Sequence, residues 1–113
     1  MAEKVLELAV FKLRDGATPD DLLATADAVS DWLATQPGFI SRELSHDAEG
    51  ERWIDVVWWT TMRNALEAAE LAITSAQCAP MFALIASEST LMLHGELAVR
   101  AAGPSSGPFR AAP

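Results

Sequence analysis

Two titratable residues of this sequence, His94 and Asp55, stand where acid–base chemistry is possible. Asp55 lies in the middle of 52–60, a run rich in β-branched and aromatic residues that is typical of a buried strand. An ionised carboxylate in such a strand needs a charged partner, a solvated cavity or a shifted pKa. We expect His94 on the strand beside Ala9, diagonal to Asp55, where the carboxylate would stabilise the protonated imidazole. The pair could then act as a general acid or base near neutral pH.

Both residues also have purely structural interpretations. His94 could be hydrogen-bonded within an interface between two subunits, and Asp55 could pair with Arg42 or Arg52 across that interface. Strand alternation places Arg42 on the helix-covered side, so we expect its side chain to extend off an edge strand towards water. No Lys or Arg borders Cys78 in the sequence to lower its thiol pKa, so Cys78 is expected to be a small buried residue.

Other chemistries lack their residues in this chain. Two histidines and one cysteine give no spaced metal-binding cluster, and no glycine-rich phosphate loop, Walker motif or Gly-x-Ser-x-Gly elbow is present. Eight basic against sixteen acidic residues give a formal net charge of −8, which argues against nucleic acid or an anionic membrane as a partner. No signal-peptide pattern and no apolar run of about 18 residues are found. We therefore expect a cytoplasmic protein.

The elements that must position these residues follow from the hydrophobic pattern. The chain has 113 residues, 50% of them hydrophobic, and is expected to form one domain over 1–99. Residues 100–113 are expected to form a C-terminal tail, in which Phe109 is the one residue that could anchor it. The order β-α-β-β-α-β predicts a ferredoxin-like α+β fold, with a four-stranded antiparallel sheet whose first and third strands are central. The predicted strands span 5–12, 39–46, 52–60 and 89–99, and the predicted helices span 19–35 and 62–79, with a short helical turn from Pro80.

The two faces of this sheet differ in composition. One is uniformly apolar and is expected to pack beneath both helices: Leu6, Leu8, Val10, Ile54, Val56, Trp58, Leu91, Leu93 and Leu97. The other mixes aromatic residues with carboxylates and a histidine: Glu7, Ala9, Phe11, Trp53, Asp55, Val57, Trp59, Met92, His94 and Glu96. Helices cover only one side of such a sheet, so we expect the mixed face to close against a second subunit. Incomplete filling between the two sheets would leave one pocket per subunit.

The chain resembles the dimeric α/β-barrel superfamily, and most of all its antibiotic-biosynthesis-monooxygenase (ABM) domains. The residues that carry the resemblance are Pro37-Gly38-Phe39 before the second strand, Trp58-Trp59-Thr60-Thr61 with Ala65 at the entry to the second helix, and the segment Ser75 to Phe82. The resemblance covers roughly residues 4–99 and implies a homodimer with a cavity between sheet and helices. In some such proteins the cavity hosts oxygenation of a polycyclic phenol without metal or flavin, and others degrade haem.

Single residues match that resemblance only in part. Trp59 matches the tryptophan that closes the third strand, whereas Asp55 stands where the monooxygenase members have an asparagine. Ala65 stands where those members have an aromatic hydroxyl. The haem-degrading members use a histidine and a tryptophan at the second helix, and 62–79 contains neither, which disfavours haem chemistry.

The function expected from the sequence is that of a small homodimeric enzyme, monooxygenase-like and independent of cofactor or metal. It would act on an aromatic or polyketide-like molecule. The residues predicted for proton transfer are His94 and Asp55, and those predicted to line the pocket are Trp59, Phe11, Glu7, Met92 and Trp53. Two alternatives remain open: a non-catalytic binding or structural dimer whose apolar side chains fill the interface, and an isomerase or lyase on the same scaffold.

Overall fold

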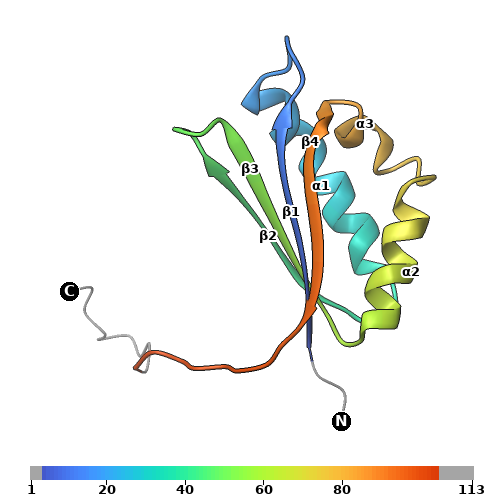
Figure 1. The fold of residues 1–113 in the computed structure, drawn as a ribbon. Helices are drawn as coiled ribbons and strands as arrows, with labels where there is room; N and C mark the ends of the chain where they lie inside the picture. Colours follow the sequence, from blue (N-terminus) through green and yellow to red (C-terminus); the bar gives the residue numbers. More distant parts are fainter. Residues whose placement is uncertain (1–3, 105–113) are drawn as a thin grey trace.

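The computed structural model describes residues 4–104 and shows a four-stranded antiparallel sheet covered by helices on one side (Figure 1). The strands follow the order β2-β3-β1-β4, so the first and third strands are central. This confirms the predicted ferredoxin-like fold. Phe109, the expected anchor of the tail, lies outside the described residues, as does the rest of 105–113. The elements are β1 (Val5–Leu13), α1 (Pro19–Ala34), β2 (Phe39–Asp47), β3 (Arg52–Trp59), α2 (Met62–Ala72), α3 (Ala79–Phe82) and β4 (Ile85–Glu96).

Side-chain caps determine where the two longer helices begin. Thr18 precedes α1 in a capping box, in which its hydroxyl accepts from the Asp21 N–H at 3.1 Å and the Asp21 carboxylate accepts from the Thr18 N–H at 2.9 Å. Thr61 precedes α2, and its hydroxyl accepts from the Asn64 N–H at 3.0 Å. Within 4–104, no helix is both long and apolar enough to cross a membrane.

Gly38 joins the end of α1 to β2 at a tight contact with the start of α2. Its φ of +82° lies in the left-handed region, and a Cβ there would meet the side chains of Asn64 and Thr60. Its carbonyl accepts from the Thr60 N–H at 2.9 Å. Only glycine satisfies both the backbone angle and the close approach, and this contact holds the entry of α2 against the edge of the sheet.

The helices cover the face of the sheet opposite to the predicted one, and this corrects the sequence-based assignment. The mixed face lies beneath the helices, where Trp59 is fully buried and Phe11 is 2% exposed. The apolar face is uncovered, and Leu93 there is 51% exposed. We call it the open face, and its members are Leu6, Leu8, Val10, Ile54, Val56, Trp58, Leu91 and Leu93. Large aromatic rings bury more apolar area than aliphatic side chains, so the face that carries them forms the core even though it also carries carboxylates.

Two element boundaries also differ from prediction. α2 ends at Ala72 rather than near Ala79, and its buried residues are Ala65 and Ala68. β4 begins at Ile85 rather than Ser89, and its pairing with β1 shifts register between Val10 and Lys12. The Lys12 N–H donates to the Ser89 hydroxyl at 2.9 Å at this irregularity. A bulge of this kind breaks the alternation of side chains, which is why the pattern hid the start of the strand.

Candidate functional site

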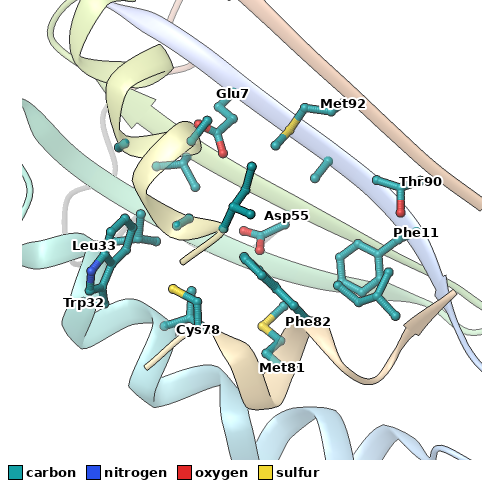
Figure 2. Close-up of a pocket in the computed structure, with 18 of the residues that line it drawn as sticks. Glu7, Phe11, Trp32, Leu33, Asp55, Cys78, Met81, Phe82, Thr90 and Met92 are labelled. Carbon is teal, nitrogen blue, oxygen red and sulfur yellow. The ribbon is translucent and has the colours of Figure 1, made fainter. Parts of the chain in front are cut away.

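A cavity of ≈ 790 Å³ lies between the helix-covered face of the sheet and the helices (Figure 2). This volume is within the range of sites that enclose small organic molecules. The strands contribute Glu7, Ala9, Phe11, Asp55, Val57, Trp59, Ile85, Ser87, Thr90 and Met92. The helices and the segment between them contribute Val29, Trp32, Leu33, Ala68, Ala69, Glu70, Ala72, Ile73, Cys78, Met81 and Phe82. The cavity lies within one chain, not between two sheets as the sequence suggested.

Small side chains provide the space of the cavity. Ala68, Ala69 and Ala72 of α2 line it on one side, and Ala9 of β1 lines it on the other. Methyl groups at these positions leave room that larger residues would fill, so the helix can span the sheet without packing closely on it. The lining residues Ile73, Phe82 and Met92 are partly exposed, which marks the opening between the α2–α3 segment and β4.

Glu7 is a half-buried carboxylate, and its partners contact only one of its two oxygens. Its Oε1 accepts from the indole Nε1–H of Trp59 at 3.1 Å and lies 3.3 Å from His94 Nε2. No described residue donates to Oε2, and the carboxylate borders the cavity. Burial raises the pKa of Glu7 above its ordinary value, the nearby charge of Asp55 raises it slightly further, and the contacts with His94 and Trp59 oppose the rise. Glu7 is therefore poised to hold or release a proton at the cavity wall.

Asp55 is held in a different way. Both of its oxygens accept from the guanidinium of Arg42, at 3.0 Å and 2.8 Å, and the Arg42 side chain is only 4% exposed. The same guanidinium donates to the Ala26 carbonyl at 3.0 Å and the Ser30 hydroxyl at 2.9 Å, both in α1. Arg42 therefore does not extend off the edge strand as expected, and instead fastens β2 and β3 to α1.

The structure does not bring the predicted pair together. His94 lies opposite Glu7, while Asp55 lies opposite Ala9 and Met92 lies on the other side of Ala9. The register thus differs by one cross-strand pair from the one expected: Glu7, and not Ala9, lies directly beside His94, and His94 contacts Glu7 while Asp55 stays diagonal to it. His94 is not among the lining residues and reaches the cavity through Glu7.

The predicted pocket residues divide into two groups. Phe11, Glu7, Trp59 and Met92 line the cavity, although it is enclosed by helices rather than by a second subunit. Trp53 is buried outside the lining, where its indole stacks on the imidazole of His46 with ring centroids 4.0 Å apart.

Sequence reasoning missed every helical residue of the lining. It named Arg42 as a possible partner of Asp55, but across a subunit interface, whereas the pair forms within one chain. Strand alternation placed Arg42 on the helix-covered face, as observed, but the sequence assignment put Asp55 on the opposite face, so the pair within the chain was not expected. Cys78 is buried as predicted and also borders the cavity. Within the described residues no group of three His, Cys, Asp or Glu side chains is arranged to hold a metal ion.

No protein-family model matches the sequence, and neither does any curated protein. Solved structures do match. SnoaB from Streptomyces nogalater, a cofactor-independent oxygenase, is 17% identical at a TM-score of 0.63, over 92% of this chain and 100% of that one. A proposed antibiotic biosynthesis monooxygenase from Bordetella bronchiseptica is 18% identical at a TM-score of 0.69, over 86% and 99% of the two chains. A dimeric ferredoxin-like protein of unknown function from Thermobifida fusca is 17% identical at a TM-score of 0.68, over 86% and 93%.

The chain has the fold of the ABM proteins. This confirms the resemblance stated from the sequence, at the level of the fold. At these identities the likeness carries no residue roles, so the chemistry of the cavity is argued from its own side chains.

Proposed function

We propose that this protein is a small enzyme that binds an aromatic or polyketide-like molecule in the cavity and takes a proton from it through Glu7. The observation that carries the proposal is a half-buried carboxylate, held through one oxygen and without a described donor at the other, in the wall of an apolar cavity of ≈ 790 Å³. A raised pKa makes such a carboxylate a stronger base than one in water. His94 and Trp59 act as positioning residues, because both contact the anchored oxygen.

The favoured reaction is an oxygenation without metal or flavin. Glu7 would remove a proton from an acidic CH₂ group that is flanked by aromatic rings, leaving a carbanion. Dioxygen would oxidise this carbanion: one oxygen atom becomes a carbonyl oxygen of the product, and the other leaves as water with the two hydrogens of the CH₂ group. The likeness of fold to a cofactor-independent oxygenase supports this choice of reaction.

Oxygen uptake with an anthrone as probe tests the proposal. The wild-type rate should exceed that in buffer, and Glu7→Gln should lower kcat/KM by about two orders of magnitude, because the amide cannot accept the proton. Glu88→Gln is the matched control, since Glu88 is exposed on β4 outside the lining and its substitution removes the same charge. A Glu7→Gln rate equal to the wild-type rate would exclude Glu7 as the base.

Isomerisation is the second candidate reaction, because it requires the same proton transfer and no oxygen. Asp55 and Ala65 stand where the monooxygenase members of the resemblance have an asparagine and an aromatic hydroxyl, which favours a reaction that does not need those groups. Deuterium exchange into an enolisable probe under nitrogen separates the two reactions. Exchange without oxygen uptake favours the isomerase, and ligand binding without either activity favours a binding protein.

The protein is further proposed to be a homodimer through the open face. The side chains of β1, β3 and β4 make that face apolar, and no helix of the chain covers it. Leu91 and Leu93 on it are more than half exposed, which is typical of a surface that meets a partner. A solved structure of the same fold is dimeric. Leu93→Asp should shift sedimentation towards the monomer. Leu71→Asp, at an equally exposed leucine on α2, should leave the dimer intact. A wild-type monomer at micromolar concentration would refute this part of the proposal.

A further inference from the structure

The charged residues that line the cavity are all acidic. They are Glu7, Asp55 and Glu70, and the lining contains no lysine, arginine or histidine among the described residues. Glu70 is exposed on α2, so its charge lies in water near the opening. The two carboxylates inside the cavity are therefore the ones that a ligand would meet.

The nearest buried cation cannot serve an anionic ligand. Arg42 has five N–H donors, and all are used. They contact both oxygens of Asp55, the Ala26 carbonyl, the Ser30 hydroxyl and, at 3.6 Å, the sulfur of Met81. A carboxylate or phosphate on a ligand could recruit Arg42 only by breaking a buried ion pair, which is strongly unfavourable.

The carboxylates of Asp55 and Glu7 thus differ in the negative charge that a ligand in the cavity would meet. Asp55 is neutralised by Arg42 at close range, whereas Glu7 keeps a free oxygen at the cavity wall. His94 is the sole described cation-forming group in contact with Glu7, and it approaches the oxygen that is already anchored. The free oxygen can accept a hydrogen bond from a ligand, and the bond is stronger when the donor carries a positive charge.

We propose that the cavity selects its ligand by charge, and that the preferred ligand is an aromatic molecule carrying a protonated amine that donates to Glu7 Oε2. A ligand with a neutral hydroxyl in the same place binds more weakly, and a ligand with a carboxylate is excluded. The inference rests on the proposed function, because it requires that an aromatic body occupy the cavity against Phe11, Phe82 and Trp59. An amine that donates to Oε2 occupies the oxygen that would take the proton, so such a ligand competes with the substrate and does not react.

Three probes of nearly equal size and shape test the charge rule on the wild-type protein: naphthylethylamine, naphthylethanol and naphthylacetate. Titration calorimetry at neutral pH measures each affinity, and the NMR signal of the Trp59 indole N–H reports whether the probe reaches Glu7. We expect the amine to bind at least about tenfold more tightly than the alcohol, and the carboxylate to bind most weakly. The Trp59 signal should move with the amine and the alcohol.

Glu7→Gln removes the charge and keeps the shape, so the preference for the amine over the alcohol should disappear. Glu88→Gln removes the same single negative charge at an exposed position outside the lining, and the preference should persist. Equal affinity for the three probes, or tightest binding of the carboxylate, would overturn the charge rule and leave the aromatic cavity of the proposed function in place. Absence of binding by all three probes would overturn both.

Discussion

Two carboxylates on neighbouring central strands point to the same side of the sheet, yet their surroundings give them opposite roles. Asp55 meets a buried guanidinium through both oxygens and is part of the packing between β2, β3 and α1. Glu7 meets an indole and an imidazole through one oxygen, and its other oxygen is left for the cavity. The comparison shows that burial alone does not mark a reactive acid. The charge of its partners, and whether they occupy one oxygen or both, decide whether it is structural or available.

The largest expected effect comes from breaking the Asp55 side of the comparison. Arg42→Met leaves a buried carboxylate without its cation, and the free energy of unfolding should fall by about 3 kcal/mol. Glu7→Gln should change it far less, because the amide oxygen still accepts from Trp59. Urea denaturation measures both values. If Arg42→Met unfolds as wild type does, Asp55 is not held by that pair. The double variant Arg42→Met/Asp55→Leu should recover part of the loss.

A second prediction concerns the cavity that leaves Glu7 accessible. Ala65 and Ala68 are both buried on α2, but only Ala68 lines the cavity. Ala65→Leu should destabilise the protein by about 1–3 kcal/mol through overpacking. Ala68→Leu should cost little stability, because the cavity accepts the added atoms, and should weaken binding of naphthylethylamine. Equal destabilisation by both substitutions would mean that the cavity closes in solution.

The pH dependence of stability should separate wild type from Glu7→Gln. A carboxyl with a raised pKa binds its proton more tightly in the folded state than in the unfolded chain. Wild type should therefore lose stability relative to Glu7→Gln as pH rises from the ordinary glutamate pKa through the raised pKa. Below that window the difference between the two proteins should be constant. A difference that grows in favour of wild type with rising pH would show that the Glu7 pKa is lowered instead.

The smallest effects are shifts in the pKa of Glu7 itself, and two neighbours should move it in opposite directions. His94→Gln removes a contact that lowers the pKa, so the pKa should rise. Asp55→Asn removes a negative charge that raises the pKa, so the pKa should fall. Carbon NMR of the Glu7 carboxyl, followed against pH, measures both changes. Shifts of the same sign would contradict the arrangement of the three groups.

Much of the fold could be predicted because its signals are local. The elements and their order along the chain were recoverable from periodicity among residues close in sequence, and that order predicted the arrangement of the sheet. The strand boundary at Ile85 was not, since a bulge opposite β1 disturbs the alternation that reveals strands. Alternation alone groups Glu7, Phe11, Trp59 and Met92 on one face, and all four line the cavity.

The covered face and the partners of the carboxylates were decided only by the tertiary structure. Both faces of the sheet carry enough apolar residues to form a core, and the choice depends on how large aromatic rings and α1 pack together. Partner choice depends on cross-strand register, and a shift of one pair places Glu7 instead of Ala9 beside His94. The sequence by itself determined the elements, their order and the two sets of side chains, because these follow from short-range periodicity. The structure decided which set meets the helices and which acid remains free, because these depend on long-range packing and register.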